Sequence, residues 1–500
     1  MTLLSNAPLH NQSNYAGYLG AKHRVGMAFI CMLLASSSLA NIARADTLAE
    51  AITMAYQHNP NLQKQRALTR ANDETYVQAR SGLGPNLSVG TSTSFTNEKI
   101  NQYGALVSSN QPGFSVPSTT TLSVSLSQSI FTSGKIKSNI DAAEASVLST
   151  QAQLASYEQQ VLYNVINVYS AVRRDEEALK ISQDSLKYNQ NQLDQTKARF
   201  TVGELTKTDV AQAQAAVAQA QSSLAAAQGR LDSDRAIYKD VVGQAPTALS
   251  AEPEFNNIPK DFDGAMDVAE KQNPDLMAAL LAERSASFRV KAARSAFGPT
   301  VNLVGQYSDY APTSQFGSIK LRDYTGEVNV NLPLFTSGLN SSNVRAAAEN
   351  DTAQQLGVEA TRRDLLQNVS QAWANILSSR SSILANTENV RASAVAAEGT
   401  RNEYTAGLRT TFEVLNAQLT YENAQLALLD AKRSAYLAEA QLLVYMGQLS
   451  IGDFAPNVKT YDAAKHFKNI KQKGSTPIDL VTGALDAGGQ AIVTSLSPKK

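Results

Sequence analysis

Few residues in this sequence have the types and spacing that catalysis or metal binding requires. Histidine is the usual side chain for proton transfer near neutral pH and a frequent metal ligand, yet beyond residue 45 only His58 and His466 occur, far apart in the chain. The single cysteine is Cys31, close to the N-terminus. Neither a Gly-x-Ser-x-Gly motif nor a phosphate-binding glycine loop is present. The sequence therefore predicts no enzyme, no cofactor and no metal site.

The N-terminus has the layout of a secretory signal peptide over residues 1–45. A basic step at Lys22-His23-Arg24 precedes an apolar run from about Val25 to Ala40, and Ala43-Arg44-Ala45 follows as a cleavage site. A transmembrane anchor is the alternative, but this run is short and interrupted by serines. Cleavage removes Cys31 and three basic residues but no acidic one. The mature chain is then slightly acidic, which disfavours a nucleic-acid binder.

The chain is organised around a strand that leads into a very long helix. Leu122, Val124, Leu126 and Ile130 alternate with serines, which is the period of a strand with one apolar face. The alternation ends at Phe131-Thr132-Ser133-Gly134, and from Lys135 to Val202 there is no glycine or proline. A helix of that length would extend about 100 Å at about 1.5 Å per residue. Ordinary globular helices are several times shorter.

This strand and helix occur twice. The sequence Ile-Phe-Thr-Ser-Gly at 130–134 returns as Leu-Phe-Thr-Ser-Gly at 334–338, 204 residues later, and at the same offset Tyr169 aligns with Trp373. We therefore predict a tandem duplication of a roughly 200-residue unit. The predicted domains are a first repeat at 46–245, a linker at 246–261, a second repeat at 262–450 and a C-terminal tail at 451–500. The tail is expected to be partly disordered towards its end, and its function cannot be read from the sequence.

Each repeat is predicted to contain the same elements in the same order. A helix opens each repeat, with Asp46 and Asp263 as expected N-caps and an Asn-Pro break after the first turns. The predicted strands lie at about 86–96, 120–131, 300–310 and 324–335, with a polar loop at about 97–118. After each long helix, a shorter one at 206–242 or 410–446 repeats apolar residues every seven positions, with alanines three residues on. That period indicates coiled-coil packing.

The strand number has a consequence for assembly. Each strand is about ten to twelve residues long, which is enough for a tilted strand to cross an outer membrane. A hairpin on a soluble core would give the same pattern and stays an alternative. Four strands cannot close a membrane barrel, since the smallest have about eight, and an open edge in lipid would leave backbone groups unpaired. If the strands lie in a membrane, several chains must contribute to one barrel.

With these elements, residues 46–450 resemble the TolC family of outer-membrane channel-tunnels. The most specific local sign is the segment from Tyr404 to Gln418, beside the paired Phe-Thr-Ser-Gly junctions. The resemblance implies a homotrimer with a mixed fold, in which three chains form a 12-stranded transmembrane β-barrel and a coiled-coil tunnel of 12 helices. It also implies a location in the outer membrane of a Gram-negative bacterium, with the tunnel in the periplasm.

The resemblance implies a function as a passive exit duct for export. Its expected partners are a periplasmic adaptor and an inner-membrane pump, either an ABC transporter or a proton-driven pump. The expected process is type I protein secretion, multidrug efflux or both. An exported coiled-coil structural or adhesive protein without a pore is the alternative. A periplasmic adaptor is a second one, but the lipoyl-like region it should carry is not visible.

The resemblance also implies roles for residues at the ends of the coils. Tyr404 and Arg409 match the inner-coil latch residues of a gate, which would bind Asp209 and Thr208. A bland interpretation is that all four are solvated helix residues near a turn.

Two further sets of residues follow from the resemblance. Glu413 matches an acidic ring at the pore constriction, whereas Asn416 stands where a second ring has aspartate, which argues against strong cation selectivity. The expected adaptor contacts are at Gly203, Glu204, Gly407 and Leu408, which also serve as the turns between the coil helices.

Overall fold

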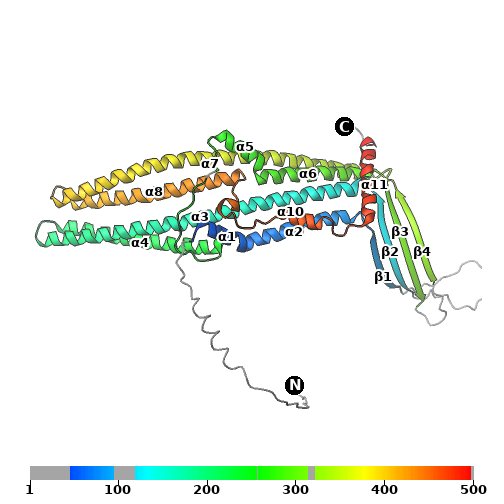
Figure 1. The fold of residues 1–500 in the computed structure, drawn as a ribbon, viewed down its shortest axis with the longest axis horizontal. Coiled ribbons are helices and arrows are strands. Elements are labelled where there is room, and N and C mark those ends of the chain that lie inside the picture. Colours follow the sequence, from blue (N-terminus) through cyan, green and yellow to red (C-terminus); the bar gives the residue numbers. More distant parts are fainter. Residues whose placement is uncertain (1–45, 95–118, 256, 313–320, 497–500) are drawn as a thin grey trace, which may run out of the picture. The chain divides into compact units, whose positions relative to one another are not determined.

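The computed structural model describes residues 46–94, 119–255, 257–312 and 321–496 (Figure 1). The predicted signal peptide and the predicted loop at 97–118 lie outside the described residues.

The strands of both repeats form one antiparallel sheet in the order β1-β2-β3-β4. These are β1 (Asn86–Ser94), β2 (Thr119–Phe131), β3 (Thr300–Pro312) and β4 (Leu321–Asn331). The last strand ends before the predicted residue 335, because Pro333 lacks the backbone N–H that pairing needs. Since β2 pairs with β3, the hairpins of the two repeats are joined in the middle of the sheet, and β1 and β4 are its edges.

The sheet has one apolar and one polar face. Val89, Val124, Tyr307 and Tyr324 stand opposite one another in a single row across all four strands. The polar face carries hydroxyl pairs such as Ser88 and Ser125, whose oxygens lie 2.6 Å apart. Val89 on the apolar face is 67% exposed and Val328 is 65% exposed. Much of the apolar face of the sheet is therefore exposed in the single chain.

Each opening segment consists of two helices. They are α1 (Leu48–His58) and α2 (Pro60–Ser81) in the first repeat, with α5 (Phe262–Gln272) and α6 (Pro274–Arg294) in the second, followed by the short η1 (Ser295–Phe297). The break falls at Asn59 and Asn273, which cap the second helix of each pair.

The predicted N-caps Asp46 and Asp263 are wrong by one and two residues. Thr47 caps α1, because its hydroxyl accepts from the Glu50 backbone N–H while the Glu50 carboxylate accepts from the Thr47 N–H. Asp261 caps α5 by accepting from the Gly264 N–H at 2.9 Å. Asp46 instead accepts from the Thr247 backbone N–H in the linker. In both helices the observed cap accepts a hydrogen bond from the backbone N–H three residues further along the chain.

Four helices make up the two coils. The long helices α3 (Lys135–Thr201) and α7 (Leu339–Thr405) have 67 residues each, and they are followed by α4 (Lys207–Val242) and α8 (Thr411–Tyr445). The predicted ladders lie partly in the packed interfaces: Ala213, Ala220, Leu231 and Tyr238 are buried on α4, and Val414, Ala424, Ala431, Ala435, Ala438 and Leu442 on α8. Helix α3 also packs against α6 and α8, so it touches both repeats.

The main hydrophobic core lies around the middle of α3, where α1, α5, α7 and α8 converge. Tyr169 is fully buried there, and its hydroxyl donates to the carbonyl oxygen of Ser250 at 2.8 Å or of Asp46 at 2.9 Å. Trp373, its counterpart in the second repeat, is half-buried and packs against the same core. Both are packing residues.

The described part of the C-terminal tail contains three helices, and the predicted disorder towards the end of the tail stays a prediction. It contains α9 (Ile451–Phe454), α10 (Ala463–Ile470) and α11 (Pro477–Leu496). Helix α10 packs on α2, and its His466 contacts the buried Asp73 at 2.7 Å. Figure 1 shows α11 crossing the boundary between the helices and the strands.

Candidate gate at the helical hairpin tips

The two coil turns have the same construction. Gly203 and Gly407 take left-handed φ angles of 82° and 79°, which L side chains rarely adopt. Thr206 and Thr410 then begin α4 and α8, each in a capping box with the acidic residue three positions later. The predicted adaptor contacts Gly203, Glu204, Gly407 and Leu408 are all exposed. Local sequence is sufficient to build these tips.

Tyr404, one of the predicted latch residues, is buried on the first-repeat side of the tip. Its side chain is only 2% exposed, and the Arg199 guanidinium lies 4.9 Å from its ring centroid. Arg199 also donates to the Tyr404 carbonyl oxygen at 3.3 Å. Among the described residues, no hydrogen bond of normal geometry reaches the buried Tyr404 hydroxyl, although Glu204 first and then this phenol raise the pKa of Arg199. A buried phenol without a partner carries a desolvation cost of about 1–3 kcal/mol.

Arg409, the second predicted latch residue, is bound within its own repeat. Its guanidinium contacts Glu403 at 2.7 Å and Glu413 at 2.8 Å. These two carboxylates, Glu403 first, raise the pKa of Arg409.

The first-repeat side of the predicted latch is also occupied locally. Asp209 accepts from the backbone N–H and the hydroxyl of Thr206, and these bonds, with the nearby Thr411 hydroxyl, lower its pKa. Thr208 is exposed. Within the part of the chain that the structure describes, no hydrogen bond or ion pair links Tyr404 or Arg409 to Asp209 or Thr208. The four residues lie at neighbouring tips, and the latch between them stays a prediction.

The predicted constriction residues differ in their surroundings. The Glu413 carboxylate accepts from the Thr410 backbone N–H at 2.9 Å and from Arg409 at 2.8 Å. The Thr410 backbone bond first, and then Arg409, lower the pKa of Glu413 to about 2. Asn416, one turn on, is exposed. Arg409 therefore offsets the charge of Glu413, which weakens the field expected of the predicted acidic ring.

A polar seam joins α3 to α8 above the tips, and sequence reasoning missed it. Ser185 donates to the buried Glu422 at 2.6 Å, and Arg174 donates to Asp430 at 2.8 Å. Further along, Arg433 donates to Asn167 at 2.7 Å. No local signal identifies these pairs, because each joins residues more than 200 positions apart.

A cavity of about 610 Å³ lies beside this seam, between α3, α4 and α8. Its walls include Asp175, Asn189, Ala220, Asn416 and Glu422. Asp175 is buried and pairs with Arg174 at 2.6 Å. Burial first, and then Asp175, raise the pKa of the neighbouring Asp234. Arg174 and Arg230 line the same cavity, so its charged groups are of both signs.

Two absences apply to the described residues. None of their helices is both long enough and apolar enough to cross a membrane. Nor do they contain three or more histidine, cysteine, aspartate or glutamate side chains grouped so that they could hold a metal ion.

Comparison with known families decides the class of protein. The model of the outer membrane efflux protein family matches residues 51–239 and 265–448. The chain belongs to this family. The two matched segments fall inside the two predicted repeats, and the resemblance to TolC-type channels is confirmed. Membership places the protein in the outer membrane of a Gram-negative bacterium, and members of the family are channels for efflux or type I secretion, not enzymes.

Three relatives illustrate the range of the family. The outer membrane efflux protein BepC of Brucella suis is 28% identical over 437 residues, covering 86% of this chain and 92% of that protein. Outer membrane protein TolC of Escherichia coli is 26% identical, with 84% and 86% covered. The alkaline protease secretion protein AprF of Pseudomonas aeruginosa is 24% identical over 322 residues, covering 62% of this chain and 66% of that protein.

A solved structure shares the fold. The outer membrane protein VceC of Vibrio cholerae superposes with a TM-score of 0.68 at 21% identity, covering 80% of this chain and 96% of that chain. The arrangement of coils and sheet described above is therefore shared with this outer membrane protein.

Proposed function

We propose that three copies of this chain assemble into one export duct, with a 12-stranded barrel in the outer membrane and a helical tunnel in the periplasm. The observation that carries this proposal is the four-stranded sheet, which has two edges and an exposed apolar face. Lipid cannot hydrogen-bond to the free backbone groups of an edge strand, so β4 of one copy must pair with β1 of the next. Three copies supply 12 strands.

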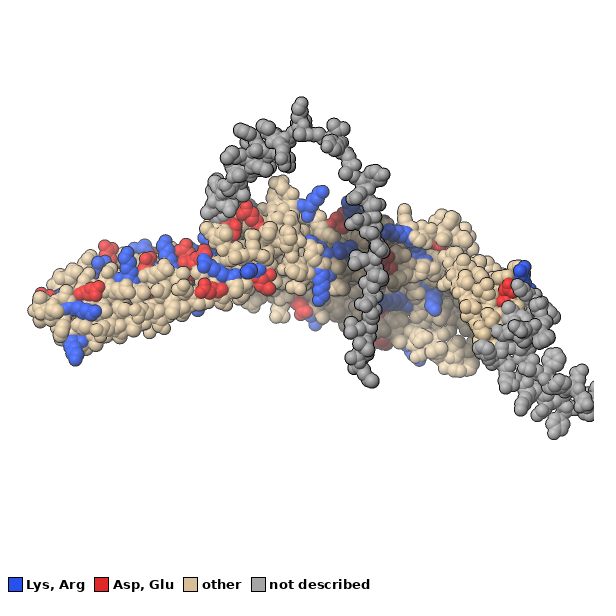
Figure 2. Space-filling model, turned by 90° about the horizontal axis from the view of Figure 1, so that it is seen from below, with Lys and Arg blue, Asp and Glu red and all other residues tan. Residues whose placement is uncertain are grey.

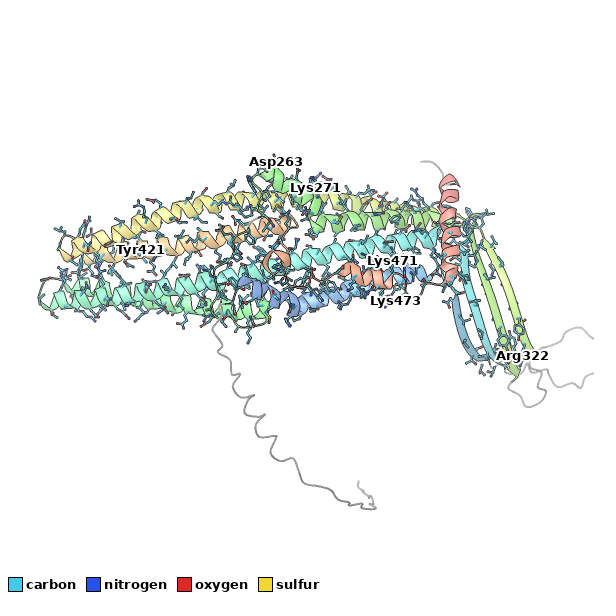
Figure 3. The ribbon with its side chains drawn as sticks, in the orientation of Figure 1. Asp263, Lys271, Arg322, Tyr421, Lys471 and Lys473 are labelled. Atoms are coloured by element: carbon cyan, nitrogen blue, oxygen red, sulfur yellow. The ribbon has the colours of Figure 1, made fainter. Side chains whose placement is uncertain are left out.

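The distribution of charged side chains supports the placement of the sheet in the membrane and of the helices in the periplasm. Arg322 lies near the end of the sheet far from the helices (Figure 3), where its guanidinium is 3.9 Å from Asp309. In Figure 2 the visible part of the sheet is otherwise nearly free of charged side chains, whereas both signs are spread along the helices. A band with few charges suits the membrane, and a mixed charged surface suits the aqueous periplasm.

We test the assembly by measuring mass and conductance of the purified full-length protein. Light scattering in detergent should give three chains per particle, and planar bilayers should give single-channel currents. A monomer, or a trimer that passes no current, would contradict the proposal.

The tips are proposed to form the periplasmic gate, with Tyr404 and Arg409 latched to Asp209 and Thr208 of the same or a neighbouring subunit. The buried, unpartnered phenol of Tyr404 favours this, because it retains a donor for a partner that the single chain does not supply. Replacing both latch residues, Tyr404→Phe with Arg409→Ser, should raise the conductance of the resting channel severalfold.

The matched control for this variant is Tyr421→Phe on α8. This substitution removes a phenolic hydroxyl that lies away from the tips and accepts a hydrogen bond from Gln425 of the same helix. Its conductance should equal that of the unmodified channel. If the double variant also shows unchanged conductance, the latch is excluded.

The constriction is proposed to be formed by Glu413 and Asn416. The single carboxylate ring, partly neutralised by Arg409, should give weak cation selectivity. Asn416→Asp should restore a second ring and shift the reversal potential in a salt gradient toward that of a cation-selective pore. An unchanged reversal potential in the Asn416→Asp variant would show that Asn416 does not line the pore.

The exposed tips Gly203, Glu204, Gly407 and Leu408 are proposed to bind a periplasmic adaptor, which couples the duct to an inner-membrane pump. By their names, BepC supports efflux and AprF supports protein secretion as the process served. A photo-crosslinker at Glu204 or Leu408, in cells, should capture the adaptor, and one at Leu332, just past the end of β4, should not. An ABC transporter captured with the adaptor would indicate type I secretion, and a proton-driven pump would indicate efflux.

A further inference from the structure

The C-terminal helix α11 binds the strand–helix junction of the first repeat through one face. Thr482, Asp486 and Gly489 recur at helical spacing and are buried. The Asp486 carboxylate accepts from the backbone N–H groups of Thr132 at 2.7 Å, Gly134 at 3.0 Å and Lys137 at 3.1 Å. Helix α11 is therefore fixed in orientation at the start of α3.

The opposite face of α11 is apolar and exposed. Leu480 is 80% exposed and lies opposite the buried face that includes Asp486, whereas Val481, which is 61% exposed, lies with Ile478 and Leu485 on an adjoining apolar stripe at spacings of three and four residues. The only charged residues of the helix are Asp479 and Asp486. Asp479 accepts from the Thr476 backbone N–H at the helix N-terminus, and Asp486 is buried at the junction. Neither carboxylate lies among the exposed apolar side chains, so burying those side chains would not desolvate a charge.

The sheet register shows on which side of the sheet α11 lies. Phe131 stands opposite Val301, which stands opposite Val330, so Phe131 belongs to the apolar face. A Cβ added to Gly489 would lie 2.6 Å from the Phe131 ring, so α11 touches the sheet on this face. Gln128, on the same face, is covered, and both it and Thr482 donate to the Leu83 carbonyl oxygen. The exposed face of α11 therefore continues the apolar face of the sheet.

We propose that α11 is an interfacial membrane helix, whose exposed face lies among the phospholipid acyl chains just below the headgroups of the periplasmic leaflet. The inference rests on the proposed function, because it takes the apolar sheet face as the lipid-facing one. If that face meets lipid, lipid also reaches α11, which borders the helix-side end of the strands (Figure 1). An apolar helix face that lies parallel to the surface binds there through its buried apolar area.

Basic residues precede this helix and suit anionic headgroups. Lys468 and Lys473 are exposed, and Figure 3 shows Lys471 and Lys473 beside α10, ahead of α11. Lys471 is held by Glu144 at 2.7 Å, so Lys468 and Lys473 are the cations available to a headgroup. Each lysine near an anionic surface favours binding.

The test measures the depth of α11 in a bilayer with the full-length protein. In a Cys31→Ser background, Leu480→Cys carries a bimane fluorophore, and the protein is placed in nanodiscs of phosphatidylethanolamine and phosphatidylglycerol. Quenching is measured with phospholipids that carry a nitroxide at acyl carbon 5 or carbon 16. Leu485→Cys is a second site, on the apolar stripe that adjoins Leu480. Leu332→Cys, one residue past the end of β4, and Leu408→Cys at the tip are the positive and negative references.

The expected result is quenching at Leu480 and Leu485 at least half as strong as at Leu332, and stronger from carbon 5 than from carbon 16. Quenching no stronger than at Leu408, with Leu332 quenched, would overturn the membrane helix and leave the channel in place. A disulfide between the Leu480→Cys positions of two subunits would also overturn the membrane helix, because it would show that a second copy of the chain covers this side of α11. If Leu332 itself is not quenched, the placement of the sheet fails as well.

Discussion

The two strand–helix junctions have the same sequence and backbone but different surroundings. Ser133 and Ser337 have φ angles of 55° and 51°, and Gly134 and Gly338 have 86° and 85°. Ser133 is nevertheless buried, and its hydroxyl donates to the Pro299 carbonyl oxygen at 2.6 Å, whereas Ser337 is exposed. The adjoining aromatic residue of the second junction, Phe335, is 86% exposed.

The difference comes from a segment that was not duplicated. Helix α11 occurs once and covers the first junction, where Asp486 places a carboxylate at the N-terminal end of α3. A negative charge there is favoured by the helix dipole and by the unpaired N–H groups of the first turn. Within the described part of the chain, the only side chain that accepts a hydrogen bond from the first turn of α7 is Thr336, whose hydroxyl lies 3.5 Å from the Asn340 N–H. The two junctions therefore share the conformation of the turn, and the contact with α11 distinguishes the first junction from the second.

The largest expected effect is the loss of the Asp486 carboxylate. Asp486→Ala leaves several buried N–H groups at the start of α3 unpaired, which should cost about 3 kcal/mol of stability. Hydrogen exchange should rise at residues 132–138 and not at the equivalent residues 336–342. Asp479→Ala, which removes only the carboxylate that accepts from Thr476 at the start of α11, should cost about 1 kcal/mol. Equal exchange at both junctions in the Asp486 variant would refute the asymmetry.

Two adjacent glycines of α11 give the next contrast. A Cβ at Gly489 would lie 2.6 Å from the Phe131 ring and 2.8 Å from the Ser133 Cα, so Gly489→Ala must displace the helix, at about 2 kcal/mol. A Cβ at Gly488 would meet nothing within 4 Å, and Gly488→Ala should stabilise the helix by about 0.5–1 kcal/mol. Proteolysis of the tail should be faster in the first variant and slower in the second. The same rate in both would mean that α11 is not docked on Phe131.

The two positive-φ serines should respond with opposite signs. Ser337→Gly relieves an unfavourable backbone conformation at an exposed site and should stabilise the protein by about 0.5 kcal/mol. Ser133→Gly gives the same relief but loses the hydrogen bond to Pro299, for a net loss of about 1 kcal/mol. The measurement is the melting temperature of each purified variant. Shifts of the same sign would show that both junctions are covered equally.

The smallest effect concerns the acidic caps of the two tips. The pKa of Glu413 is lowered from 4.5 to about 2, so its ionised form is favoured by folding above pH 4.5, and this contribution disappears as the pH falls toward 2. Channel conductance should therefore change only below about pH 3. Arg409→Ala should move that change upward toward pH 4.5, while Asp209, which has no arginine partner, keeps its own titration. An unshifted pH profile would exclude the Arg409 pair.

Local pattern was sufficient for much of the fold. Period-two alternation, glycine junctions and heptads depend on neighbouring residues, so the strands, the 67-residue helices and the tips lie close to where the sequence predicts them. The family resemblance of the Tyr404–Gln418 segment likewise needs no tertiary contact. Composition also sufficed to argue against an enzyme, because the histidines are few and isolated.

Contacts between distant residues were decided only by the tertiary structure. Asp46 and Thr47 are both good caps in sequence, and the competing linker contact to Thr247 separates them. Asp486 lies more than 340 positions from the α3 start that it caps, so no pattern in the tail identifies its partner. Tyr404 and Arg409 have several possible partners at the tips, and packing directs them to Arg199 and Glu403. The physical reason is that periodicity specifies a face of an element, whereas burial and hydrogen-bond competition select what that face meets.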